Sequence, residues 1–415
     1  MSESFLFVTQ YFPPERGAAQ VRLGAITADL ARRGHDVDVV TALPNYPTGR
    51  IFPGWRRRPV RTATEGGIRV TRVWVWAAMG SGLGRLANYL SFGLMSLLGL
   101  ARSRRAEWVV VEYPTLFGAL PAVVWAGLRH RRVVVIVADL WLDAIVGVGA
   151  LGDGLVVRWL RRAERWMLRR CDAVTVVTEG VRDAVLAKDV VPGRIVWLPN
   201  GADTAMFSPG PPDPALARRI GVPEGNALFV YAGTHGFVHG LEVVLDAAAL
   251  LVDDPVTFVL VGGGSEKDHL VDLARTRGLD NVRFLDPVPP EEVADLLRSA
   301  TAGLATVRAG DAYRAIRSAK MFPTMATGIP VIYSGGDEGS RLVLEAGAGV
   351  VTEPGDGAAL ASAVREVLGD PVRAQELGSA GRRWVEEHAS WHQLVGDWLE
   401  QVRALRAPTV GESVR

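Results

Sequence analysis

The sequence predicts an α/β protein with two doubly wound, Rossmann-like domains that face a cleft. Its 415 residues exceed the length of one usual hydrophobic core. Short apolar runs alternate with helical patterns along the chain, the rhythm that builds parallel sheets covered by helices. This rhythm stops at a Pro- and Gly-rich stretch near residues 199–212 and then starts again. Apolar residues at 48% and charged residues at 22% indicate a globular chain.

The first half opens as a βαβ unit. A strand is expected at residues 5–9, followed by a Gly-bearing loop, a helix at 18–33, Gly34 as its stop and a second strand at 36–41. Continuous apolar runs favour strands covered on both faces. The further elements expected in this half are strands at 68–76, 108–112, 133–138, 173–178 and 195–198, and helices at 83–101 and 156–170.

The second half repeats the pattern. The elements expected are strands at 228–232, 257–261, 282–285, 303–306, 330–333 and 349–351, and helices at 240–251, 266–277, 290–299, 320–327 and 358–369. Two helical patterns follow at 381–388 and 391–405, and the last is rich in Trp, Leu and Val. We expect it to cross back onto the first domain. The predicted domains are therefore 1–200 with the crossover helix 390–406, and 201–389.

Charge is divided unevenly along the chain. Residues 1–200 hold 27 Lys and Arg against 16 Asp and Glu, whereas the remainder holds 19 against 29. The basic half is suited to an anionic partner, although a solvated basic face explains the charge equally well. The apolar stretch 86–101 is shorter than the ~20 residues of a spanning helix. A buried amphipathic helix is the first interpretation, and a helix on a bilayer surface, flanked by Arg85 and Arg102, is the second.

Two further features bear on the compartment. The single cysteine, Cys171, excludes an internal disulfide and suits a reducing environment. The N-terminus lacks a basic segment before its apolar run, so we interpret it as a first strand and not as a signal peptide. We expect a cytoplasmic protein, with peripheral contact at the inner face of the membrane left open.

The usual catalytic motifs do not occur in the sequence. It has no HExxH, CxxC, GxSxG or GxxxxGK[ST] segment, and Gly262-Gly263-Gly264 lacks the dinucleotide fingerprint. No metal or other cofactor and no nucleic acid is therefore expected. Two helix starts, after Gly236 and at Ser318–Lys320, offer N–H groups to anions, and Arg317 and Lys320 add positive charge. Two such ends facing one cleft suit a diphosphate.

Asp139 follows an apolar run, which places it at the carboxyl end of a strand, where open α/β sheets bind ligands. A catalytic role competes with a simpler one. An aspartate in this position is more often the N-cap of the next helix.

Ten segments in order resemble family-4 glycosyltransferases of the GT-B fold. The chain carries YFPPERGAAQVRLGAITADLARRGHDVDVVT, LPNYPTGRIFPGW, VVVEYPTLFGAL, VADLW, VVTEGV, LPNGADTAMFSP, YAGTHGFVHGLEVVLDAA, FVLVGGGSEKDHL, NVRFLDPVPPEEVADLL and KMFPTMATGIPVI. Each is weak alone, and their order over nearly the whole chain is specific. PNYPTG and ADLW resemble the branch of fucosaminyl and acetamidosugar transferases of cell-surface polysaccharide assembly.

The resemblance implies a retaining, metal-independent transfer of a sugar from a nucleoside diphosphate, with UDP-sugars favoured, to a hydroxyl acceptor on a lipid-linked sugar or small glycoside. It implies Asp139 as the catalytic group and acceptor contacts at Asn45, Tyr46 and Trp141. The donor would be held by Gly17, Gly233, Thr234, Gly236, His239, Gly240, Phe284, Leu285, Val288, Arg317, Ser318, Ala319 and Lys320.

The chain departs from the family pattern in its acidic pair. The two places of the E-x7-E motif fall on Ala315 and Pro323, so the usual ribose contact is unassigned, with Asp311 near in sequence. Two alternatives therefore stay open beside the sugar transferase. One is a GT-B enzyme of other chemistry, such as a pseudo-glycosyltransferase or a nucleotide-sugar epimerase. The other is a non-catalytic, membrane-associated partner.

Overall fold

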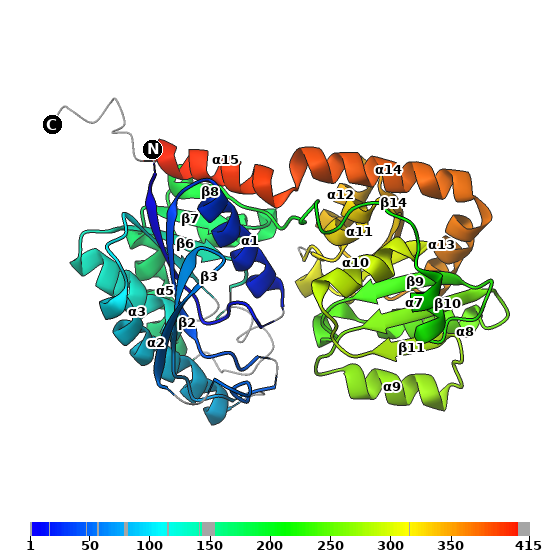
Figure 1. Ribbon diagram of the computed structural model, residues 1–415, viewed down its shortest axis with the longest axis horizontal. Coiled ribbons are helices and arrows are strands. Elements are labelled where there is room, and N and C mark those ends of the chain that lie inside the picture. The colour runs from blue at the N-terminus through cyan, green and yellow to red at the C-terminus, as the bar shows by residue number, and fades with distance from the viewer. Residues whose placement is uncertain are drawn as a thin grey trace. The chain divides into compact units, whose positions relative to one another are not determined.

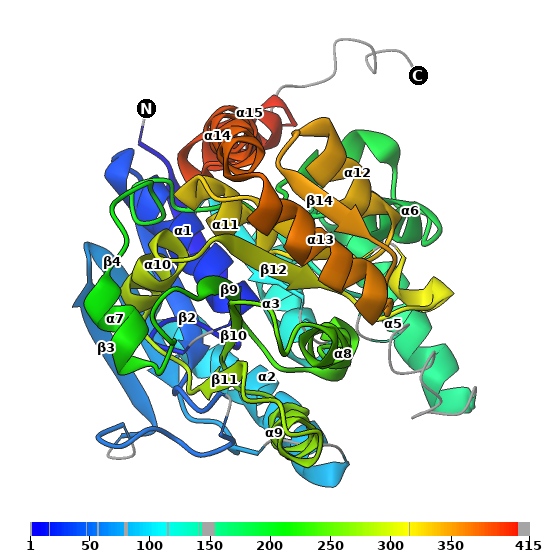
Figure 2. The same ribbon diagram turned by 90° about the vertical axis from the view of Figure 1, so that its right-hand side faces the viewer.

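The computed structural model describes residues 2–15, 17–46, 48–55, 58–78, 82–113, 116–140, 142, 154–314 and 316–405. The chain forms two compact units (Figures 1 and 2). The first comprises residues 1–199 and 394–415, and the second residues 200–393. Each unit is built on one twisted sheet covered by helices, so the predicted fold class is confirmed.

The first unit contains an eight-stranded sheet with the order β3-β4-β2-β1-β5-β6-β7-β8. Every neighbouring pair is parallel except β3 with β4. Strand β3 was not predicted, because this edge strand alternates polar residues and leaves much of its surface exposed. The strands are β1 Ser4–Val8, β2 Asp36–Ala42, β3 Val60–Glu65, β4 Ile68–Val73, β5 Trp108–Glu112, β6 Arg132–Val137, β7 Ala173–Val176 and β8 Ile195–Trp197.

Helices cover both faces of this sheet. The larger core cluster joins Leu6, Val8, Val109 and Val111 of the central strands to side chains of α2, α3 and α5, which therefore lie on one face. Helix α3 was also not predicted. The helical elements are α1 Ala18–Arg32, α2 Leu83–Arg102, α3 Leu116–Leu128, α5 Leu155–Arg170, α6 Glu179–Leu186 and the short η1 Pro192–Arg194.

The second unit contains a six-stranded, wholly parallel sheet with the order β11-β10-β9-β12-β13-β14. The order reverses between β9 and β12, and ligands of open α/β sheets bind at such a switch point, beyond the carboxyl ends of the strands. The strands are β9 Ala227–Ala232, β10 Val256–Val261, β11 Val282–Leu285, β12 Ala302–Thr306, β13 Val331–Ser334 and β14 Gly349–Thr352.

The helices of the second unit include one that is longer than expected. The pattern predicted a helix only at 381–388, but α14 begins at Pro371, where the Asp370 side chain accepts a hydrogen bond from Arg373 N and caps the helix. The elements are α7 Pro214–Arg219, η2 Phe237–His239, α8 Glu242–Leu250, α9 Lys267–Thr276, α10 Pro290–Arg298, η3 Asp311–Tyr313, α11 Met321–Thr327, α12 Asp337–Glu345, α13 Gly357–Gly369 and α14 Pro371–His388.

The last helix, α15 (Trp391–Ala404), packs on the first unit, as the sequence predicted. Trp398 is fully buried, and its indole Nε1 donates a 3.0 Å hydrogen bond to Thr175 Oγ1 on β7. The Trp398 ring lies 6.3 Å from that of Phe5 on β1. At the end of the helix Arg403 pairs with the buried Glu3 at 2.6 Å. The C-terminal helix is therefore a structural part of the first unit.

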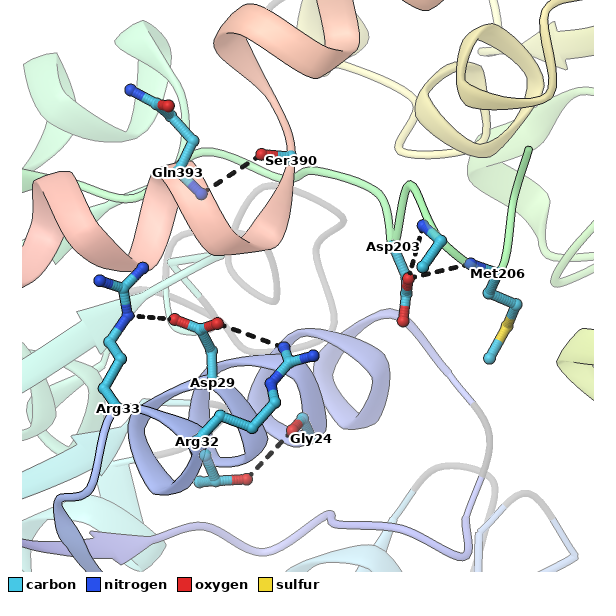
Figure 3. Close-up of polar contacts among 10 residues, drawn as sticks. Gly24, Asp29, Arg32, Arg33, Asp203, Met206, Ser390 and Gln393 are labelled. Carbon is cyan, nitrogen blue, oxygen red and sulfur yellow. Dashed lines mark hydrogen bonds and ion pairs between the residues drawn. The ribbon is translucent and has the colours of Figure 1, made fainter. Parts of the chain in front are cut away.

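The segments that enter and leave the second unit are paired with each other. Ala202 N donates to Ala389 O at 2.9 Å, and Trp391 N donates to Ala202 O at 3.1 Å. Figure 3 shows the polar contacts that shape these segments, with Asp203 Oδ1 accepting from the backbone N of Met206 and Ser390 Oγ accepting from Gln393 N. A two-residue parallel bridge thus holds together the linker and the start of α15.

One ionic cluster on α1 is visible in the same view. Asp29 is fully buried and binds the guanidinium groups of Arg32 and Arg33, which lie three and four residues later on the helix (Figure 3). The pairing neutralises a carboxylate that burial alone would disfavour.

Candidate functional site

A Gly-flanked loop at the carboxyl end of β9 forms the centre of the candidate site in the second unit. It contains the predicted residues Gly233, Thr234, Gly236, His239 and Gly240. Its backbone is held from β12, where Thr306 Oγ1 donates to His239 O at 2.7 Å. Arg308 N donates to Val238 O at 2.8 Å, and Gly240 adopts a left-handed conformation with φ 54° against the Arg308 backbone. The loop is therefore fixed before any ligand binds.

The three consecutive glycines after β10 allow their own backbone to pack closely against this loop. A Cβ atom on Gly262 would lie 1.9 Å from Gly233 O, and one on Gly264 would lie 2.3 Å from His235 O. Both glycines have positive φ, 143° and 157°. His235 N donates to Gly263 O at 2.9 Å. The glycines thus allow two backbones to touch, which explains their presence without a dinucleotide fingerprint.

Lys320 lies against the loop. Its Nζ is 3.2 Å from His239 Nε2 and 5.3 Å from the centroid of the Tyr231 ring, and a Cβ on Gly233 would lie 2.2 Å from Lys320 Cε. Burial lowers the pKa of Lys320 to about 8, and burial together with the Lys320 charge lowers the pKa of His239 to about 3. At neutral pH the arrangement is a cationic lysine beside a neutral imidazole.

The polar side chains near Lys320 are buried and have few hydrogen-bond partners among the described residues. Ser318 Oγ has none, and the His235 and His239 rings interact with the backbone of Val261 and Thr306 respectively. His235 is fully buried, and burial, with the charges of Lys267 and Lys320, lowers its pKa to about 4. A buried polar atom without a partner costs about 1–3 kcal/mol. Buried polar groups with spare hydrogen-bonding capacity beside one buried cation are the strongest sign of a polar, anionic ligand in this unit.

Arg317 is more constrained than the sequence suggested. Its guanidinium lies 3.7 Å from the Glu338 carboxylate and 5.6 Å from the centroid of the Phe322 ring, and both charged side chains are largely buried. Glu338 therefore offsets part of the positive charge expected there. Helix α11 begins at Met321, and its first two N–H groups bond to Ser318 O and Ala319 O, both at 3.4 Å. The anion-binding capacity rests mainly on Lys320.

The residues expected beside the nucleotide base lie at the carboxyl end of β11, with Phe284 and Leu285 in the strand and Val288 just after it. The Phe284 ring lies edge-on to His235 with centroids 6.3 Å apart. Leu285 O already accepts hydrogen bonds from Gly262 N at 3.1 Å and Lys267 Nζ at 3.0 Å, and Val288 is partly buried. The carbonyl of Leu285 thus already makes its hydrogen bonds within the protein.

The acidic pair of the family pattern is replaced by other groups. Pro323 lies within α11, and position 315 falls outside the described residues. Asp311, suggested as a substitute, is almost fully exposed and lies 3.6 Å from Arg314. Sequence reasoning missed Glu338, on the first turn of α12, and also missed His235. The Gly-flanked setting of His235 was visible in the sequence, but its burial was not.

A second polar cluster lies at the carboxyl edge of the sheet in the first unit. Asp139 follows β6 by two residues and is exposed. On the adjacent β5, Glu112 is buried and accepts from Arg22 at 3.0 Å and from Thr9 Oγ1 at 2.6 Å. Burial raises the pKa of Glu112, with a smaller contribution from the charge of Asp139. Most of the helix that Asp139 was alternatively expected to cap lies outside the described residues.

The residues expected on the acceptor side are organised by Glu15. Its buried Oε1 accepts from Asn45 N at 2.7 Å and Tyr46 N at 2.8 Å, and its Oε2 accepts from Phe12 N at 3.2 Å. Burial raises the pKa of Glu15 to about 7, although these hydrogen bonds oppose the shift. A Cβ on Gly17 would lie 3.4 Å from Tyr46 Cε1. Trp141 lies outside the described residues.

Among the described residues, no group of three or more His, Cys, Asp or Glu side chains could hold a metal ion. Within the same residues, none of the helices combines the length and the apolarity needed to cross a bilayer.

Known proteins match both units. Residues 17–201 match the family described as "Glycosyl transferase 4-like domain", and residues 213–384 match "Glycosyl transferases group 1". "Putative colanic acid biosynthesis glycosyl transferase WcaI" of Escherichia coli is 27% identical over 400 residues, covering 93% of this chain and 97% of WcaI. A "D-inositol 3-phosphate glycosyltransferase" of Corynebacterium diphtheriae is 24% identical, covering 91% of this chain and 86% of its own.

Solved structures show the same fold. Anabaena Alr3699/HepE, in complex with UDP and glucose, superposes with a TM-score of 0.71 at 17% identity, covering 97% of this chain and 100% of that chain. With the two matched segments, these comparisons show that the chain belongs to family 4 of the glycosyltransferases and has the GT-B fold. It is a retaining glycosyltransferase that uses a nucleoside-diphosphate sugar as co-substrate, in a family that needs no metal. The predicted class of enzyme is confirmed.

Proposed function

We propose that the second unit binds the donor, that Lys320 contacts its diphosphate and that the donor is a UDP-sugar. The observation that carries this proposal is the buried Lys320 ammonium, which lies 3.2 Å from His239 Nε2 and two residues after Ser318, whose hydroxyl has no partner among the described residues. A diphosphate supplies acceptor oxygens for Lys320 and for the N–H of a neutral histidine. The choice of UDP is supported by HepE, whose structures contain UDP-glucose and UDP.

The remaining donor contacts follow from the same loop. In this proposal Thr234, Gly236 and Gly240 present backbone to the phosphates. Ser318, with its unpartnered hydroxyl, and Ala319 lie toward the sugar. Phe284, Leu285 and Val288 border the base, with Leu285 contributing through its side chain because its carbonyl is already bonded. Glu338, held beside Arg317, replaces the missing acidic pair.

The acceptor is proposed to bind the first unit through the loop of Asn45 and Tyr46, with Trp141 as a further contact. Gly17, which lies against Tyr46, keeps its expected role beside the donor phosphates. Asn45 Oδ1 is buried without a partner among the described residues, which suits an acceptor hydroxyl as donor. A sugar carried on a lipid or a small glycoside fits this chemistry. Asp139 would orient the attacking hydroxyl and stabilise positive charge at the sugar, while Lys320 stabilises the departing diphosphate.

A lipid-linked acceptor requires the enzyme to reach a membrane. We propose that the basic first unit makes this contact peripherally, on the cytoplasmic face. Seven arginines and no carboxylates occur in α2, in α3 and in the segments that directly follow them, residues 83–105 and 116–132. Basic residues near an anionic surface each contribute about 1 kcal/mol, an interaction that salt weakens.

A donor screen tests the function. Purified protein would be heated with UDP-glucose, UDP-galactose, UDP-N-acetylglucosamine, GDP-mannose or ADP-glucose, and slow hydrolysis of each donor would be followed. We expect one UDP-sugar to raise the melting temperature most, because a ligand present at 100 times its Kd stabilises by about 2.7 kcal/mol. Stabilisation by a GDP- or ADP-sugar alone would overturn the choice of UDP.

A further inference from the structure

Helix α2 is apolar on both of its faces. Its inward face buries Phe92 and Leu100 together with Asn88 and Ser96, and its outward face is made of leucines spaced three and four residues apart. Leu83 is 85% exposed and Leu94 70% exposed. The complete set of exposed leucines on this face, which we call the leucine face, is Leu83, Leu86, Leu90, Leu94, Leu97 and Leu98.

The inward face explains how α2 is held without burying these leucines. A Cβ on Gly93 would lie 2.3 Å from Phe117 O of α3, and one on Gly99 would lie 2.6 Å from Val40 Cγ1 of β2. Asn88 bonds to Gln10 and to Trp76 O, and Ser96 Oγ donates to Gly93 O at 2.8 Å. The glycines and the satisfied polar groups seat the helix tightly, so the fold does not require the leucine face.

A basic pocket adjoins the C-terminal ends of α2 and α3, which pack side by side (Figure 1). Its volume is about 390 Å³. The arginines that line it, which we call the arginine pocket, are Arg104, Arg105, Arg129 and Arg131, beside Leu128 and Trp125. Leu128 is 77% exposed. The pocket lies at the amino ends of β5 and β6. Glu112 is the last residue of β5, and Asp139 lies two residues after β6, so both are at the opposite, carboxyl edge.

We propose that the leucine face of α2 lies in the outer layer of an anionic bilayer and that the arginine pocket binds the phosphate of a lipid headgroup. The leucine face runs from residue 83 to residue 98, roughly 22 Å along the helix, which suits a helix lying in the membrane plane. The two parts adjoin at the C-terminal end of α2, where Leu100 and Ala101 line the pocket directly after Leu98, so apolar insertion and headgroup binding occur at one surface. This proposal rests on the membrane contact proposed above.

Charge decides between lipid and protein as the occupant. The same two helices and the segments after them contain arginines at both ends of the leucine face and no carboxylate that would pair with a basic partner. On the neighbouring α5, Trp159 is 68% exposed and lies beside Arg162, an amphipathic pairing typical of the membrane–water interface. A bilayer supplies an apolar layer for the leucine face and a phosphate layer for the arginine pocket.

Vesicle flotation tests the proposal with the full chain. The vesicles are phosphatidylcholine alone or phosphatidylcholine mixed with phosphatidylglycerol. We expect the protein to float with the mixed vesicles and to be released by salt. Leu94→Glu should weaken this binding at least about tenfold. Arg104→Gln and Arg129→Gln should each weaken it about fivefold. Donor hydrolysis should be unchanged in all three variants, because Arg104 and Arg129 lie at the opposite edge of the sheet from Asp139 and Leu94 is exposed on the outer face of α2.

Matched controls come from the second unit. Leu344 is 63% exposed on α12, and Arg383 is exposed on α14, so Leu344→Glu and Arg383→Gln should leave flotation unchanged. Equal binding of neutral and anionic vesicles, or wild-type flotation of Leu94→Glu, would overturn the proposal. The proposal would also be overturned if the protein did not bind vesicles and instead self-associated through a contact that Leu94→Glu abolishes. Flotation without donor hydrolysis would refute the proposed function and leave the membrane surface standing.

Discussion

Lys320 Nζ lies 3.2 Å from His239 Nε2, across the loop that follows β9 of the second unit. The neutral imidazole can accept from the ammonium, and the same ring interacts with the backbone of Thr306. Lys320 is therefore positioned by the protein before a phosphate arrives, and little reorganisation is needed on binding.

Removing this cation should weaken binding of the donor. Lys320→Ala is expected to reduce UDP affinity by about 1.5–3 kcal/mol, because one charge-assisted hydrogen bond is lost. Calorimetric titration measures the change, and the melting temperature checks the fold. Arg383→Ala, on an exposed face of α14, is the matched loss of charge and should bind UDP normally. Unchanged affinity in Lys320→Ala would remove this lysine from the site.

Donor binding should depend on pH above neutrality. Burial lowers the pKa of Lys320 from 10.5 to about 8, and a bound diphosphate favours the charged form, so binding above pH 8 must take up a proton. The Kd should be flat below pH 8 and rise by up to about tenfold per pH unit above it. For the folding of the free protein, the effect of raising the pH has the opposite sign to its effect on donor binding. Between pH 8 and 10.5 the unfolded chain holds the extra proton, so this group makes stability rise with pH. Titrations from pH 7 to 10 test the binding profile, which should flatten in Lys320→Ala.

The role of Asp139 can be separated from helix capping. Asparagine caps a helix nearly as well as aspartate, so capping alone predicts near-normal turnover for Asp139→Asn. A group that orients the acceptor hydroxyl predicts a fall of about 100-fold or more in kcat. Steady-state rates decide between the two. Asp183→Asn, at an exposed site on α6, is the control for loss of a carboxylate in the same unit.

The C-terminal helix should be needed for the stability of the first unit. Trp398 is fully buried and bonded to Thr175, so Trp398→Ala should cost about 3–5 kcal/mol of unfolding free energy. Urea unfolding followed by circular dichroism measures this. Trp166 on α5 is 44% exposed, and Trp166→Ala should change the stability by less than about 0.5 kcal/mol. Similar stabilities of the two variants would contradict the packing described for α15.

Much of the fold could be predicted from the sequence because parallel strands buried on both faces are continuous apolar runs. Strands β5 and β11 were predicted to the residue. The edge strand β3 was missed, since its Thr and Arg residues face solvent and leave no apolar run. The first ten residues of α14 were missed as well, because their stripe of small residues packs against α11 and carries little hydrophobic signal.

The candidate site was less accessible to sequence reasoning. Lys320 could be named because charge, a helix start and the family resemblance coincide in one segment. His235 depends on the approach of a second loop, made possible by Gly264, and Glu338 depends on contact with a guanidinium 21 positions earlier in the chain. Both are products of tertiary packing, which no local pattern encodes.

The discontinuous make-up of the first unit has a consequence for the order in which the protein folds as the ribosome produces it. Residues 200–393 form a continuous segment that is complete before the last helix emerges. The first unit has its sheet early but lacks the Trp398 side chain until the final residues are translated, leaving Phe5 and Thr175 uncovered in the interval. The half of the chain that is synthesised first is thus the last to finish folding, and a nascent chain that has emerged from the ribosome up to residue 393 would hold one finished unit and one unfinished unit.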